Sequence, residues 1–175
     1  MTFASRITRS PRPFEPDRGG ESRGAIPDTD EEIAGLIEGA GGSSPYLKTL
    51  IEKEAGWLSG ALDDPEAAFD ALLDELRDLT EDPAVPLRQA KRRVALLTGL
   101  ADLAGVWPLE EVTGRLTRFA DLAVQKALEH AIRREITRGK LPGASEDDVP
   151  TGAGMTVLAM GKMGAGELNY SSDID

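Results

Sequence analysis

The residues of this chain that could do chemistry are concentrated in one stretch, residues 161–175, which reads GKMGAGELNYSSDID. Gly161, Gly164 and Gly166 would let the backbone turn sharply and approach a ligand closely, because glycine has no side chain to collide with it. If a short helix begins in this turn, its free N–H groups would point at an anion such as a phosphate. Lys162 would add a cation to the same site.

An acidic pair closes this stretch. Asp173 and Asp175 are separated by one residue, so on a strand their side chains would share a face. Two carboxylates there would make a hard oxygen site for Mg²⁺, which bridges phosphates in phosphoryl transfer. The short apolar run before the glycines, residues 156–160 (TVLAM), is typical of a buried strand. Each signal alone is common in loops, but strand, glycine turn, short helix and Asp-x-Asp in that order are more specific.

The chain before this stretch has the apolar spacing of a helical bundle. The expected helices begin at Thr29, Ser44, Asp64 and Leu87, and a last one runs from about Leu109 to Arg138 after a corner at Trp107 and Pro108. Gly39, Gly41 and Gly42 are expected to end the first helix. We therefore predict a mainly α fold, with strands only at residues 156–160 and at the end of the chain.

Composition divides the chain further. Residues 1–27 are rich in Pro, Gly, Arg and Ser and are predicted to be a disordered arm, because they cannot bury enough apolar surface. Residues 28–138 form the helical region. Residues 139–155 return to Gly, Pro and Asp and are predicted to be a linker loop, which leads into the different element at residues 156–175.

Charge and cysteine content exclude several classes of protein. The net charge of −11 argues against nucleic-acid binding through phosphate contacts. The chain has no cysteine, which excludes disulfides and thiolate metal sites and fits a cytoplasmic protein. No apolar run approaches the ~20 residues that span a bilayer, so no membrane association is expected.

The charges are unevenly distributed along the chain. Residues 28–82 hold 16 acids and 3 bases, whereas residues 83–140 hold 11 bases and 6 acids. These blocks could form an internal complementary contact or two solvated helix faces. Four bases cluster at the start of one expected helix, namely Arg88, Lys91, Arg92 and Arg93. The helix dipole disfavours cations there, so they indicate either a functional surface or pairing with the acidic block.

The run from Met160 to Asp175 resembles the active-site signature of the glutamine synthetase adenylyltransferases, within the DNA polymerase β-like nucleotidyltransferases. Residues 44–47 (SPYL) and 87–113 (LRQAKRRVALLTGLADLAGVWPLEEVT) are similar to the same family. The resemblance covers about residues 40–175. It implies an amino-terminal helical bundle that leads, from residue 156, into the start of an α+β nucleotidyltransferase core.

The resemblance also implies a function. Family enzymes carry two nucleotidyltransferase-like domains, and this chain is similar to the first, which removes AMP from a tyrosine of glutamine synthetase by phosphorolysis and releases ADP. Asp173 and Asp175 would be catalytic Mg²⁺ ligands. The residues expected to bind ATP or ADP and phosphate are Gly161, Lys162, Gly164, Gly166 and Ser172. Glutamine synthetase is the expected partner, with a PII-type signalling protein as a candidate regulator.

The chain departs from the family pattern in two ways. Ala165 stands where the wider superfamily has Gly or Ser, so a hydroxyl contact to phosphate is missing. The sequence stops at Asp175, before the further strands and carboxylate of such a site, so we expect a truncated core that is inactive alone. Two alternatives remain: a non-catalytic helical module that binds glutamine synthetase or a regulator, and another polymerase β-like nucleotidyltransferase.

Overall fold

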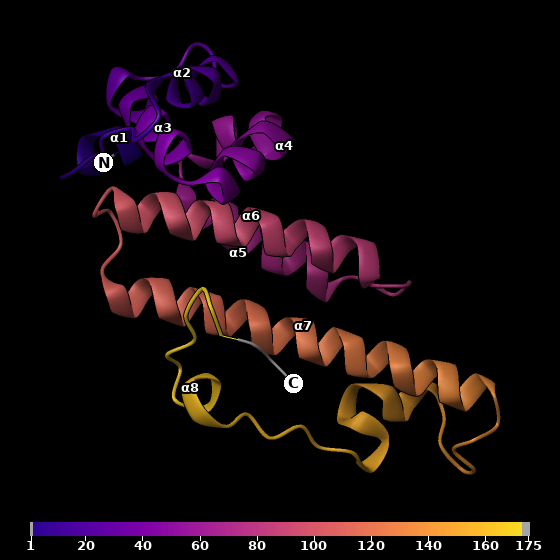
Figure 1. The fold of residues 1–175 in the computed structure, drawn as a ribbon. Helices are drawn as coiled ribbons and strands as arrows, with labels where there is room; N and C mark the ends of the chain where they lie inside the picture. The colour runs from indigo at the N-terminus through magenta and orange to yellow at the C-terminus, as the bar shows by residue number, and fades with distance from the viewer. Residues whose placement is uncertain (1, 173–175) are drawn as a thin grey trace.

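The computed structural model describes residues 2–172, and every regular element in that part of the chain is helical (Figure 1). In chain order the elements are α1 (Phe3–Arg6), α2 (Pro16–Gly24), α3 (Glu31–Ser43), α4 (Pro45–Ala61), α5 (Pro65–Arg77), α6 (Ala84–Leu103), α7 (Leu109–Thr137), the 3-10 helix η1 (Glu146–Gly154) and α8 (Gly161–Gly164). The mainly α fold predicted from the sequence is confirmed.

A long antiparallel pair, α6 and α7, organises the molecule (Figure 1). Helices α1 to α4 gather on the α6 side, and the chain after residue 138 turns back along α7. The centre of the core lies on α6, where Leu96, Leu97 and Leu100 are fully buried. None of the helices in residues 2–172 combines the length and apolar character needed to cross a membrane.

Two helix starts follow the local signals in the sequence. The Ser44 hydroxyl accepts a hydrogen bond from the Leu47 amide at 3.2 Å, and Pro45 occupies the first position of α4. At α5 the Asp64 carboxylate accepts from the Ala67 amide at 2.9 Å. Each side chain satisfies an N–H group that has no partner within the helix. The predicted starts of these helices are therefore confirmed.

The arm at residues 1–27 corrects our prediction of disorder. Residues 3–6 and 16–24 are helical, and the side chains of Phe3 and Ile26 are only 1% and 3% exposed. The Thr8 amide donates to the Ala104 carbonyl at 3.0 Å, and Arg9 donates to the carbonyls of Leu103 and Asp102. The arm has little core of its own, but it docks on a surface that the later helices provide.

The glycines of α3 explain why that docking is possible. Our prediction that they end the helix is wrong, because α3 continues through them to Ser43. A Cβ atom on Gly39 would lie 1.8 Å from the Pro11 carbonyl oxygen, and one on Gly41 would lie 2.0 Å from the Ser22 hydroxyl. The glycines therefore let the arm approach the helix backbone, which more than offsets their low helix propensity.

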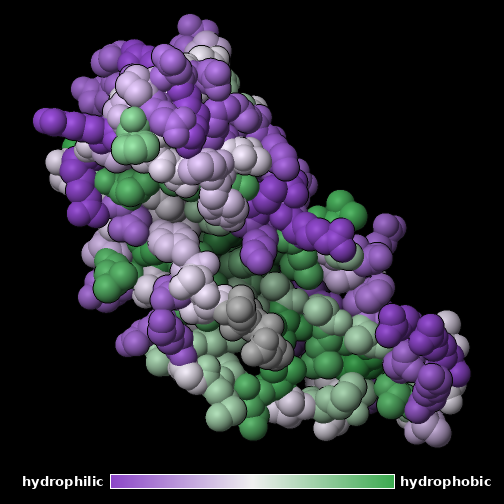
Figure 2. All heavy atoms as spheres, in the orientation of Figure 1, coloured by the Kyte–Doolittle hydropathy of each residue, from purple (hydrophilic) through white to green (hydrophobic). Residues whose placement is uncertain are grey.

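The strand predicted at residues 156–160 is absent from the described structure. The segment is extended, but no other described segment pairs with it, and a lone strand has no ladder of hydrogen bonds to stabilise it. Val157 and Leu158 are 53% and 79% exposed. Figure 2 shows apolar side chains gathered on this side of the molecule, over α7 and the returning chain.

The predicted linker at residues 139–155 is more ordered than a simple loop. Its second half forms η1, which packs along α7. Val149 is fully buried there, and Arg133 of α7 pairs with Glu146 at 2.6 Å. At its start, the Ser145 amide and hydroxyl both donate to the Asp148 carboxylate.

The acidic and basic blocks do meet inside the fold. Glu54, only 4% exposed, accepts hydrogen bonds from the side chains of Arg92 at 2.8 Å and Arg93 at 3.0 Å. Arg118 of α7 pairs with Asp70 of α5 at 2.9 Å. The internal complementary contact is therefore confirmed for these residues, and it leaves Arg88 and Lys91 of the basic cluster out.

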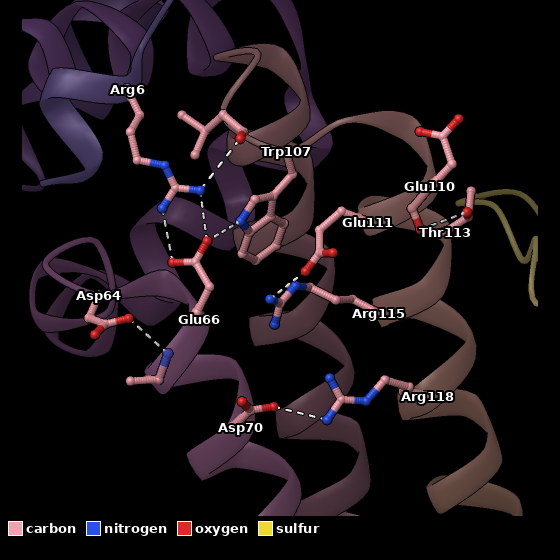
Figure 3. A network of polar contacts seen from close by, with 12 residues as sticks. Arg6, Asp64, Glu66, Asp70, Trp107, Glu110, Glu111, Thr113, Arg115 and Arg118 are labelled. Atoms are coloured by element: carbon pink, nitrogen blue, oxygen red, sulfur yellow. Dashed lines mark hydrogen bonds and ion pairs between the residues drawn. The ribbon is translucent and has the colours of Figure 1, made fainter. Parts of the chain in front are cut away.

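A second charged contact fastens the arm to the corner between α6 and α7 (Figure 3). The Glu66 carboxylate accepts two hydrogen bonds from Arg6, at 2.7 and 3.0 Å, and one from the Trp107 indole at 2.7 Å. The Arg6 hydrogen bonds lower the pKa of Glu66 to about 2, against the opposing effect of burial and with help from Trp107. Glu66 thus joins α1, α5 and the corner.

The burial of the arm gives a matched pair of variants. We expect Phe3→Ala to lower the free energy of unfolding by about 3 kcal/mol, because a buried aromatic ring is lost and a cavity remains. Phe14→Ala, in the same arm but 84% exposed, should change it by less than about 0.5 kcal/mol. Urea unfolding followed by circular dichroism measures both. Equal effects of the two variants would mean that the arm does not pack as described.

Glu66 gives a prediction about pH. Its folded pKa of about 2 lies below the ordinary value of 4.5, so its stabilisation is complete above about pH 4.5 and is lost as the pH falls toward 2. Glu66→Gln should therefore destabilise the fold by about 1 kcal/mol at pH 7, discounted for partial exposure, and by progressively less below pH 4.5. Glu75→Gln, an exposed substitution on the same helix, is the control. If Glu66→Gln lowered the free energy of unfolding by the same amount at every pH, the lowered pKa of Glu66 would be contradicted.

Candidate functional site

The glycines of the predicted site form a tight turn around α8. Gly161 and Gly166 have φ values of 57° and 75°, in the left-handed region that favours glycine. Gly164 has an ordinary φ, but a Cβ atom on it would lie 2.4 Å from the Ala159 carbonyl oxygen. The predicted short helix and sharp turn are confirmed, and each glycine has a backbone reason to be there.

The segment after this turn is anchored on the long helices. Leu168 is buried in the core, and its amide donates to the Thr117 hydroxyl of α7 at 3.1 Å. Thr117 in turn donates to the Thr113 carbonyl at 2.9 Å, which fixes the orientation of its hydroxyl. Two residues further along the chain, the Tyr170 hydroxyl lies 3.5 Å from the Asp102 carboxylate of α6. The candidate site is thus positioned by both α7 and α6.

Tyr170 is about half exposed, and its hydroxyl lies beside the Asp102 carboxylate of α6. Partial burial, reinforced by that carboxylate, raises the pKa of Tyr170 above its usual value. The hydroxyl is protonated at physiological pH, as that of tyrosine ordinarily is. It serves as a hydrogen-bond donor at this position.

Asn169 holds the backbone that leads into the acidic pair. Its side-chain carbonyl accepts hydrogen bonds from the Ser172 hydroxyl at 2.7 Å and from the Ser171 amide and hydroxyl, both at 3.2 Å. Such turns are a common use of Asn, whose side chain replaces a backbone acceptor. This contact makes Ser172 part of a hydrogen-bonded turn, whereas the sequence predicts only a ligand contact.

A recess with a volume of about 350 Å³ lies beside this turn. Lys162 and Ser172 both line it, together with Asn169 and Ser171. Two of the five predicted nucleotide-binding residues are therefore brought together. Gly161, Gly164 and Gly166 shape the turn but do not line the recess.

The recess offers a cation to an anionic ligand. Lys162 is exposed and makes no ion pair with any residue between 2 and 172, whereas the hydroxyls of Ser171 and Ser172 already donate to the Asn169 side chain. Asp173 and Asp175 lie outside the described residues, so their prediction as metal ligands remains a prediction. Within residues 2–172 no three acidic or histidine side chains gather as a metal site would require.

Comparison with known proteins gives a consistent answer. Residues 37–175 match the family model described as "Glutamate-ammonia ligase adenylyltransferase". The chain belongs to this family. The resemblance inferred from the glycine turn and its flanking segments is therefore confirmed.

Three relatives from this family show how far the similarity extends. Each has the name "Bifunctional glutamine synthetase adenylyltransferase/adenylyl-removing enzyme". The protein of Rhodopseudomonas palustris (strain BisB5) is 42% identical over 86% of this chain and 16% of its own length. The protein of Bradyrhizobium sp. (strain BTAi1) is 44% identical over 80% of this chain and 15% of its own length. The protein of Caulobacter vibrioides is 36% identical over 99% of this chain and 19% of its own length.

The chain therefore spans less than a fifth of the length of these relatives. The Caulobacter match includes the arm as well as the helical region, so the similarity reaches beyond the family model and beyond residues 40–175. No solved structure matches the chain.

Sequence reasoning missed the residues that hold the site in place. Thr117 and Asp102 lie 51 and 68 residues before their partners Leu168 and Tyr170. Thr117 carries one weak signal, because it is a polar residue beside the apolar stripe of α7, and the structure shows it only 7% exposed. Asp102 has no local signal, since an acid near a helix end is common.

Gly164 allows a test of the turn. We expect Gly164→Ala to push the turn away from Ala159 and to weaken amide protection at Leu168 by about tenfold, equivalent to about 1.4 kcal/mol of local stability. Gly114→Ala in α7 is the control, because a Cβ atom there meets nothing within 4 Å. Hydrogen exchange followed by NMR measures the Leu168 amide directly. Unchanged protection in Gly164→Ala would contradict the close approach.

Proposed function

We propose that the enzyme to which this chain belongs removes AMP from an adenylylated tyrosine of glutamine synthetase. The observation that carries the proposal is the run of residues 161–175 within the family match. The names of the relatives include an adenylyl-removing activity and glutamine synthetase as its target. The sequence of the run resembles the first of the family's two nucleotidyltransferase copies, which favours removal over attachment for this part of the enzyme.

The reaction that we propose is a phosphorolysis. An oxygen of inorganic phosphate attacks the phosphorus of the tyrosyl-AMP ester, the bond from phosphorus to the tyrosine oxygen breaks, and that oxygen takes up a proton. The products are free tyrosine side chain and ADP. Lys162 would pair with phosphate oxygens in the recess, and the turn that Asn169 holds would present the acidic pair.

The residues at the end of the run suit a magnesium ion. Asp173 and Asp175 offer carboxylate oxygens, the donors that Mg²⁺ prefers. When bound, the ion would neutralise charge on the phosphates that this chain's residues orient. ATP, ADP and phosphate as ligands, and a PII-type protein as regulator, belong to the proposal through the family relation.

The proposed activity is that of the full-length enzyme and does not extend to the 175-residue chain alone. Its helical region has its own buried core, whereas residues 155–160 pair with no described strand. Metal ligands must be held within about 0.5 Å of working geometry, which an unsupported segment does not provide. We therefore propose that a polypeptide of these 175 residues is inactive, and that contact with glutamine synthetase is the role its helical region could retain.

The acidic pair provides the test. In a family enzyme of full length that contains this chain, Asp173→Asn or Asp175→Asn should lower AMP removal by at least about 10³-fold, because the amide lacks the charge that Mg²⁺ requires. AMP attachment should be unchanged, since it would use separate carboxylates. Release of ADP from adenylylated glutamine synthetase, with phosphate and Mg²⁺, measures removal. Normal release by the variants would defeat the assignment, and release by the 175-residue chain would defeat its proposed inactivity.

A further inference from the structure

A groove runs beside the candidate site, between α6, α7 and residues 168–172, with a volume of about 630 Å³. Apolar side chains of the two helices form its floor, among them Leu116, Phe119 and Ala123 of α7. Binding grooves commonly combine such apolar surfaces with a few polar groups at their edges. This groove therefore has the character of a binding surface, and it lies outside the phosphate recess.

Two cations lie at the rim of the groove. Arg88 and Lys91 project from the first turns of α6, are exposed, and line the groove together with Tyr46 of α4. Their neighbours Arg92 and Arg93 are occupied by Glu54, but Arg88 and Lys91 pair with no carboxylate in residues 2–172. In a chain of net charge −11, such a cationic rim favours an anionic occupant.

The groove and the recess share a wall. Leu168, Asn169, Ser171 and Ser172 line both of them. A ligand in the groove therefore lies next to whatever group is held in the recess. Under the proposed function the recess takes the phosphates, so the groove is left for the other part of the same substrate, the polypeptide that carries the modified tyrosine.

From these observations we infer that the groove binds the segment of the protein substrate that flanks the adenylylated tyrosine. The inference rests on the proposed function. Apolar side chains of that segment would lie on the α6–α7 floor, and an acidic side chain would pair with Arg88 and Lys91. The groove would thus contribute to substrate specificity, because a segment without the acid would leave the cationic rim without a partner.

Charge reversal at the rim tests this role in a full-length enzyme. We expect Arg88→Glu with Lys91→Glu to raise the KM for adenylylated glutamine synthetase by about 10- to 100-fold, with kcat changed by less than about twofold, because the contact is made equally in ground and transition states. The KM for phosphate should stay the same. Both side chains are exposed, so the fold should be unaffected, which circular dichroism checks.

Two further variants make the result specific. Arg12→Glu with Lys53→Glu makes the same charge change at exposed positions outside the groove and should leave the KM for the protein substrate unchanged. Ala123→Leu narrows the groove without changing charge and should raise that KM. Arg88→Lys keeps the cation and should behave nearly as the wild type.

The other outcomes would overturn the inference. If the control variant at Arg12 and Lys53 raised the KM for the protein substrate equally, the effect would come from the overall charge of the enzyme and not from the groove. A rise in the KM for phosphate would show a site for nucleotide or phosphate, and an unchanged KM with lower stability would show that the groove is covered by the enzyme's own chain. If the wild-type enzyme releases no ADP, the proposed function fails and this inference with it. If the wild type is active and the rim variant is normal, only this inference fails.

Discussion

Trp107 fixes the corner between α6 and α7, and the placement of both the arm and the candidate site depends on that corner. Its indole is 3% exposed and donates to Glu66, and its ring lies 4.3 Å from the guanidinium of Arg115. The ring of Phe69 also lies close to this guanidinium, at 4.8 Å. Glu111 forms an ion pair with one guanidinium nitrogen of Arg115, while the other two nitrogens are buried without a hydrogen-bond partner among residues 2–172. The aromatic rings therefore add to the stabilisation that Glu111 gives this charge.

The sequence predicted those parts of the fold that depend on contacts between residues close together in the chain. The starts of α4 and α5 follow from capping side chains and prolines within a few residues, and the Trp107–Pro108 corner follows from a helix breaker after an apolar stripe. The arm could not be predicted in this way. Its helices are short and polar, and they are ordered by contacts with residues that lie between about 30 and 100 positions away. Gly39 and Gly41 are the local signal of this docking, because they leave room for the Pro11 backbone and the Ser22 side chain, but glycines in a helix equally suggest a helix end.

The candidate site shows the same division. Glycines with positive φ and the Asn169 turn are local features, so the sequence predicted the shape of the turn. The anchors Thr117 and Asp102 come from other helices and could not be found without the fold. The predicted strand failed for a related reason. An apolar, β-branched run favours a strand, but a strand also needs a partner, and no described segment pairs with residues 156–160.

The helical region therefore does more than precede the candidate site in the chain, because it also helps to build the site. The hydroxyl of Thr117 and the carboxylate of Asp102 hold the segment that leads into the acidic pair, and α6 and α7 form the groove on its other side. A shift of α7 relative to α6 would move the Leu168 anchor and change the width of the groove at once. Since Trp107 and Glu66 hold that corner together with Arg6 of the arm, the arm stabilises the geometry of the site. Arg9 of the arm also pairs with the anchor Asp102, at 3.6 Å. These distant contacts make the helical segment part of the framework that positions the candidate site.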